Sequence, residues 1–129
     1  MSDELYERGL EIRREVVGAE YVERGMERAR QDVFGKDFVD LVTEYCWGAS
    51  WGREALSRRD RSLLNLVMLG TLGRTDEFKL HVRGALRNGV TRDEIEDALI
   101  QLGIYAGVPA GMVAFRNARE VLEEEGLLG

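Results

Sequence analysis

His81 is the one histidine of the chain, and charged residues precede it at helical spacing. Glu77 lies four residues before it and Arg74 lies seven residues before it. Residues three or four apart project from the same side of an α-helix, so the three side chains share one face if this segment is helical. An imidazole titrates near neutrality, and a guanidinium binds a carboxylate through two hydrogen bonds. This face therefore suits proton transfer on an anionic substrate.

Three further arginines surround a loop that contains a tryptophan, and they could supply the cations that a multiply charged substrate needs. Arg53 lies in the loop, and Arg58 and Arg61 lie in the first turn of the next predicted helix. Cations in a first turn oppose the helix dipole, which hints at a functional use, with solvated surface charge as the alternative. Trp51 could form a wall of the same pocket or act as a packing anchor. Tyr105 is a possible pocket residue, with core packing as the alternative.

Several chemistries lack the residues that they need. A metal site requires converging His, Cys or carboxylate ligands, and a chain with one imidazole is predicted to hold no metal. A serine nucleophile is not expected, because the sequence predicts no strand-turn-helix context of the kind that positions one. Cys46 is the one cysteine and cannot form an intramolecular disulfide or a Cys-x-x-Cys pair. We predict that Cys46 is a buried structural thiol in a reducing compartment.

The net charge of −6 disfavours nucleic acid as a partner, because a phosphate backbone would be repelled and no basic stripe is present. A local cluster of arginines still allows a small anionic ligand. The first residues are charged, and no stretch approaches the roughly 18 apolar residues of a membrane span. We therefore expect no membrane partner and a cytoplasmic location.

Periodicity and punctuation predict an all-α fold. Pro109 is the one proline, and no Asn-Gly or Asp-Gly turn separates alternating apolar runs, so hairpins are not expected. The first four predicted helices span residues 3–17, 21–33, 36–47 and 58–72. The fifth begins at Thr75 or Asp76 and ends at about residue 88. The sixth begins at the capping box Thr91-x-x-Glu94 and ends at about residue 104, and the seventh spans residues 110–124. The chain of 129 residues is expected to pack these helices, six or seven in number, into a compact bundle that forms a single domain, residues 1–129.

Two of the predicted helices have apolar patterns that also indicate how they pack. Phe38, Leu41 and Tyr45 form an apolar face on the third helix, and a loop is expected over residues 48–53. Residues 58–72 are apolar nearly all round, which a surface helix of a small monomer would not tolerate. This helix is therefore either central to the fold or part of an oligomer interface.

Several separated blocks of the second half of the chain occur in the same order as in a known family. These blocks are Trp51-Gly52-Arg53, residues 56–62, Leu72-Gly73-Arg74, residues 77–81, residues 85–89 and residues 105–110. Over roughly residues 34–122, the chain resembles the carboxymuconolactone decarboxylase family. The N-terminal third resembles the family only weakly.

The resemblance implies a helical fold shared with alkyl hydroperoxidase D and a ring-shaped homo-oligomer, a trimer or a hexamer. It also implies cofactor-free decarboxylation of 4-carboxymuconolactone, an anionic lactone, to β-ketoadipate enol-lactone in protocatechuate catabolism. The peroxidase branch of the superfamily carries Cys-x-x-Cys-x-x-x-His, and this chain has Arg74 and Glu77 where the cysteines would stand. Thiol peroxidase chemistry is therefore not expected.

The resemblance turns the spacing around His81 into a mechanistic hypothesis. His81 is the proton donor or the partner of the developing oxyanion, Glu77 orients it or shares the proton transfer, and Arg74 binds a substrate carboxylate. Without the resemblance, a lone histidine is more often a surface or core residue. Two alternatives stay open: a decarboxylase or isomerase of the same fold that acts on another lactone or β-keto acid, and a non-catalytic oligomeric binding protein.

Overall fold

The computed structural model describes residues 3–128, which contain seven α-helices, one π-helical segment and no β-strand. The all-α prediction is confirmed. The chain divides after Ser57 into two compact units, Met1–Ser57 and Arg58–Gly129, each of which is described by itself. That residues 1–129 form a single domain stays a prediction. No helix in the described part is both long enough and apolar enough to cross a membrane.

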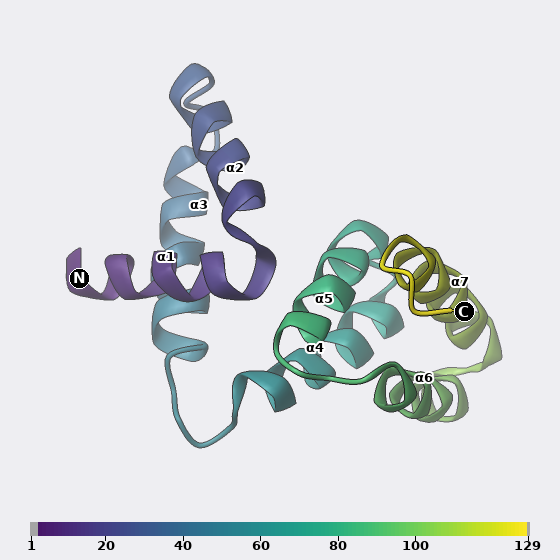
Figure 1. The fold of residues 1–129 in the computed structure, drawn as a ribbon. Helices are drawn as coiled ribbons and strands as arrows, with labels where there is room; N and C mark the ends of the chain where they lie inside the picture. The colour runs from purple at the N-terminus through teal and green to yellow at the C-terminus, as the bar shows by residue number, and fades with distance from the viewer. Residues whose placement is uncertain (1–2, 129) are drawn as a thin grey trace. The chain divides into compact units, whose positions relative to one another are not determined.

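The first unit consists of three α-helices and a π-helix (Figure 1). Their bounds are α1 Asp3–Val17, α2 Ala19–Gln31, α3 Lys36–Val42 and η1 Thr43–Ser50. The prediction that a loop begins at Gly48 is wrong, because the π-helix continues directly from α3 and ends at Ser50. The apolar face predicted on the third helix points outward, and Phe38 is 68% exposed.

Two glycines let α1 and η1 pack with their backbones in contact. A Cβ atom on Gly9 would lie 2.0 Å from the carbonyl oxygen of Thr43. A Cβ atom on Gly48 would lie 2.5 Å from the carbonyl oxygen of Leu5. Both clashes are with main-chain atoms, which a rotamer change cannot relieve, so any side chain at either position forces the two helices apart.

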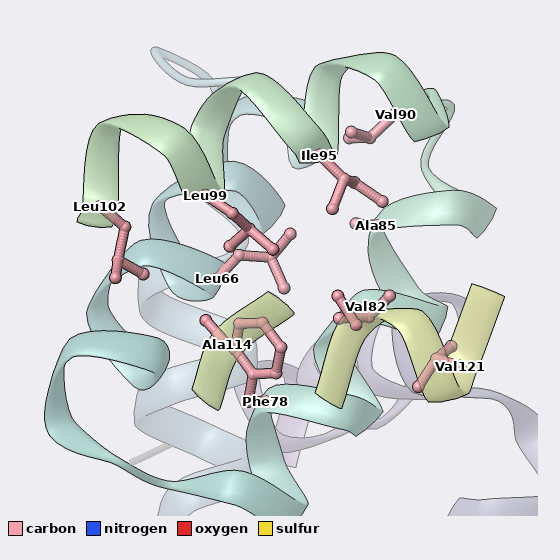
Figure 2. Close-up of a cluster of buried hydrophobic side chains, with 11 residues drawn as sticks. Leu66, Phe78, Val82, Ala85, Val90, Ile95, Leu99, Leu102, Ala114 and Val121 are labelled. Carbon is pink, nitrogen blue, oxygen red and sulfur yellow. The ribbon is translucent and has the colours of Figure 1, made fainter. Parts of the chain in front are cut away.

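The second unit is built from four α-helices (Figure 1): α4 Arg58–Leu72, α5 Thr75–Arg87, α6 Arg92–Ala106 and α7 Val108–Glu124. Each contributes buried side chains to one core. Figure 2 shows Leu66, Phe78 and Leu99 turned toward one another. The core consists of Leu66, Phe78, Val82, Ala85, Val90, Ile95, Leu99, Leu102, Ala114, Ala118 and Val121. Dispersion and burial of these side chains fix the face that each helix turns inward.

Local signals set the ends of these helices. Thr91 Oγ1 accepts from the amide of Glu94, and the Glu94 carboxylate accepts from the amide of Thr91, so the predicted capping box is confirmed. The predicted break over residues 105–109 is shorter than expected, because Gly107 alone separates α6 from α7. Its φ of 108° is a conformation that side chains disfavour, and Pro109 fits in the first turn of α7.

Replacing Gly9 with alanine should destabilise the protein by about 1–3 kcal/mol, because the new methyl group meets the backbone of η1. The matched control is Gly25→Ala in α2, where no atom lies within 4 Å of the added Cβ. That change should be neutral or stabilise by up to about 1 kcal/mol through the higher helix propensity of alanine. Urea unfolding measures both variants, and equal effects would contradict the close packing of α1 on η1.

Candidate active site

His81 lies in α5 on the side that faces α4, and only 7% of it is exposed. The amide nitrogen of Asn65, in α4, lies 3.4 Å from His81 Nδ1. A second polar contact joins the same helices, in which Asn88 Nδ2 donates to Ser62 Oγ at 2.9 Å. The imidazole is therefore held at a packed interface between two helices of the second unit.

Burial lowers the pKa of His81 from 6.5 to about 4. The cause is desolvation, which penalises the charged imidazolium and leaves the neutral ring favoured. At neutral pH, His81 is therefore a neutral imidazole with one nitrogen that donates and one that accepts. Such a ring can donate a hydrogen bond to a developing oxyanion, as a neutral electrophile, without carrying a charge of its own.

Arg58 and Arg61 lie on the same face of α4 as Asn65. Arg61 precedes Asn65 by four residues and Arg58 precedes Arg61 by three, which places successive side chains about 5–6 Å apart along one helix face. Both arginines are half-buried, and the Nε atom of Arg61 is shielded from solvent. Two of the predicted anion-binding residues therefore lie along the face of α4 that contacts His81.

The predicted helix face shared with His81 is confirmed for Glu77, which lies four residues before it in α5, but not for Arg74. Arg74 is the residue that precedes α5, with φ −87° and ψ 79°, so it does not continue the helical face of His81. The prediction that Thr75 or Asp76 caps this helix is wrong for the same reason. Glu77 is in the exposed first turn, and burial is the one cause behind the lowered pKa of His81. The structure thus puts Arg74 and Glu77 at the exposed start of α5.

The two aromatic candidates occupy contrasting positions. Trp51 is buried in the first unit, where its ring lies 4.9 Å from that of Trp47 at an interplanar angle of 31°. This contact matches the packing-anchor alternative for Trp51. Tyr105 lies in the last turn of α6 and is 85% exposed, so it is not packed in the core of the chain.

Cys46 also departs from its predicted environment. It lies in η1 and is exposed, so the prediction of a buried structural thiol is wrong. Partial burial of the thiol still raises its pKa, which disfavours the reactive thiolate. Across residues 3–128, no three His, Cys, Asp or Glu side chains converge in a way that could hold a metal ion.

Asn65 is the member of this site that sequence reasoning missed. It stands in the run Leu63-Leu64-Asn65-Leu66-Val67, where every neighbour is apolar. A polar amide on a helix that packs in a core is costly unless it finds a hydrogen-bond partner. A polar amide among apolar neighbours was therefore the sequence signal that Asn65 needs a hydrogen-bond partner. In the structure, that partner is His81.

Comparisons with known proteins agree with the resemblance noted from the motifs. The model of the carboxymuconolactone decarboxylase family matches residues 36–120. The chain is 39% identical over 128 residues to the 4-carboxymuconolactone decarboxylase of Acinetobacter baylyi, covering 98% of this chain and 94% of the relative. It is also 39% identical over 120 residues to the nitrosuccinic acid decarboxylase of Metarhizium robertsii, covering 93% and 82%.

The buried, neutral His81 predicts a specific dependence of stability on pH. The folded pKa of about 4 is below the ordinary 6.5, so the unfolded chain binds the proton more tightly and acid favours unfolding. This contribution is complete above about pH 6.5 and falls as the pH drops toward 4. Between about pH 7.5 and pH 5, the wild type should lose about 2 kcal/mol more than His81→Gln.

Urea unfolding of both proteins at the two pH values measures this difference, and the glutamine variant removes the contribution of the other titrating groups. An equal loss of stability in wild type and variant would contradict a neutral, buried imidazole.

Proposed function

We propose that this chain, which belongs to the carboxymuconolactone decarboxylase family, converts 4-carboxymuconolactone to β-ketoadipate enol-lactone in protocatechuate catabolism. The family makes it a decarboxylase, and thus a carbon–carbon lyase with the alkyl hydroperoxidase D-like helical fold. The observation that carries the proposed substrate is the 39% identity to a 4-carboxymuconolactone decarboxylase over 98% of the chain. No cofactor is invoked, because the substrate contains its own electron sink.

The reaction breaks the bond between a ring carbon and its carboxylate, and CO₂ leaves. The electron pair moves into the conjugated lactone carbonyl, which becomes an extended enolate, and a proton then adds to the carbon framework. The protein must bind the carboxylates, stabilise the oxyanion and allow proton delivery. Stabilising the oxyanion lowers the barrier because the charge exists only in the transition state and the enolate.

The geometry supports separate roles for the two faces at the α4–α5 interface. Arg58 and Arg61 would bind carboxylates of the substrate, since guanidiniums form paired hydrogen bonds with them. His81, neutral at physiological pH, would donate a hydrogen bond to the oxyanion rather than deliver a proton as a cation. Arg74 and Glu77, at the exposed start of α5, are the candidates for a further carboxylate contact and for the proton transfer.

A second candidate substrate follows from the fungal relative, which is named for nitrosuccinic acid. Decarboxylation next to a nitro group sends the electron pair onto nitro oxygens instead of a lactone carbonyl. Both reactions need carboxylate binding and a donor to an oxygen that gains negative charge. The same residues can therefore serve either substrate, and activity assays must include both.

Purified protein should release CO₂ from 4-carboxymuconolactone, with unchanged turnover in the presence of a chelator. His81→Ala should lower kcat by about 100-fold, the usual cost of losing one donor to an oxyanion. The control is Arg83→Gln on the same helix, which removes a surface ion pair with Glu124 and should keep wild-type turnover.

Turnover of nitrosuccinate alone would transfer the proposal to that substrate. His81→Ala within about threefold of wild type would overturn its assigned role. Absence of turnover on both substrates would favour the non-catalytic, oligomeric binding protein.

We also propose that the chain forms a homo-oligomer, either a trimer or a hexamer. The exposed apolar side chains of the second unit support this assembly. Leu64, Met68 and Leu72 recur every four residues along α4 and are exposed. An apolar groove of about 350 Å³ runs between α6 and α7, and Ile104, which lines it, is 74% exposed. Monomers in solution rarely leave surfaces of this kind uncovered.

Ile104→Glu should dissociate the oligomer, because burying an unpaired carboxylate in an apolar interface is strongly unfavourable. Gln31→Glu, at an exposed polar position in α2 and not among the residues that line the groove, adds the same charge and should leave assembly intact. Light scattering measures both. A wild type at the monomer mass of 14.6 kDa would contradict the assembly.

A further inference from the structure

Asn65 places a polar amide on the face of α4 that packs against α5. Leu66, its neighbour, is fully buried in the core, and His81 opposite is 7% exposed. An amide in such surroundings is stabilised by a hydrogen bond and penalised without one. The described contact of its side chain is the 3.4 Å approach of Nδ2 to His81 Nδ1.

The chemistry of the two nitrogens fixes the direction of this contact. The amide nitrogen of asparagine carries two hydrogens and can only donate. In a hydrogen bond with this amide nitrogen, His81 Nδ1 must therefore be the acceptor. A neutral imidazole has one accepting and one protonated nitrogen, so the proton resides on Nε2.

A second contact between side chains of the two helices holds this arrangement in place. Asn88, at the end of α5, donates to Ser62 Oγ at 2.9 Å, and Ser62 lies three residues before Asn65 on α4. Together with the burial of Leu66 and Phe78 in the same core, this contact fixes the register between the two helices. Asn65 therefore meets His81 at a position set by the packing of the unit, not by a mobile side chain alone.

We propose that Asn65 is a positioning residue that holds His81 in the tautomer protonated at Nε2, so that Nε2 donates to the oxyanion formed on decarboxylation. The link to the oxyanion rests on the proposed function. The tautomer itself does not, because it follows from the contact between α4 and α5 in the protein without substrate.

Nitrogen NMR of the ¹⁵N-labelled full-length protein reads the tautomer directly, since His81 supplies the one imidazole in the spectrum. The wild type at neutral pH should show a protonated Nε2 and an unprotonated Nδ1. In Asn65→Asp, the carboxylate accepts from Nδ1–H, so the two nitrogens should exchange their states. Asn117→Asp in α7, whose side chain contacts Thr75, is the charge-matched control and should leave the His81 signals unchanged.

A wild-type ring protonated at Nδ1 would overturn the proposal, and so would an Asn65→Asp spectrum identical to that of the wild type. Should Asn65→Asp fail to fold, the wild-type spectrum still decides the tautomer.

Kinetics then test the link to the reaction. Asn65→Asp should lower kcat by at least about tenfold with little change in KM, because a donor to the oxyanion acts mainly in the transition state. Unchanged kcat in a folded variant with a reversed tautomer would overturn the positioning role. A wild type inactive on both substrates would instead overturn the proposed function, while the nitrogen spectrum would still decide the tautomer.

Discussion

His81 is buried against α4, and the chemistry of the candidate site depends on that burial. Desolvation lowers the pKa of the imidazole to about 4, so the ring is neutral under physiological conditions. A neutral ring binds an oxyanion through one N–H and needs a donor for its other nitrogen, which Asn65 provides. In the proposed mechanism, the positive charge that an anionic substrate requires would come from arginines, and Arg58 and Arg61 lie on the same face of α4 as Asn65.

The hydrophobic core of the second unit is what makes this arrangement rigid. Leu66 and Phe78, both fully buried, pack α4 and α5 together, and the Asn88–Ser62 hydrogen bond fixes their register. The polar residues of the site therefore lie beside core residues of the same two helices. A substitution that loosens the core would move the imidazole relative to the arginines and reduce activity without touching the substrate.

The sequence predicted the helices of the second unit well, because caps and apolar periodicity are local properties. Helix α4 spans the predicted residues 58–72, and the Thr91–Glu94 capping box begins α6. The π-helix at Thr43–Ser50 was missed, since its hydrogen-bond register leaves no distinct apolar pattern. Arg74, Glu77 and His81 were grouped by their spacing along one helix. The Asn65–His81 contact instead joins two helices through residues that are sixteen apart in the sequence. Such contacts depend on which helix faces pack, and sequence spacing does not reveal this.

The most direct test of the account is the titration of His81 itself, followed through the Cε1 proton of the one imidazole in the full-length protein. A neutral, buried ring predicts a midpoint near pH 4, with no protonation as the pH falls through 6.5. A midpoint at 6.5 or above would show a solvated or charge-paired imidazole and would contradict the account.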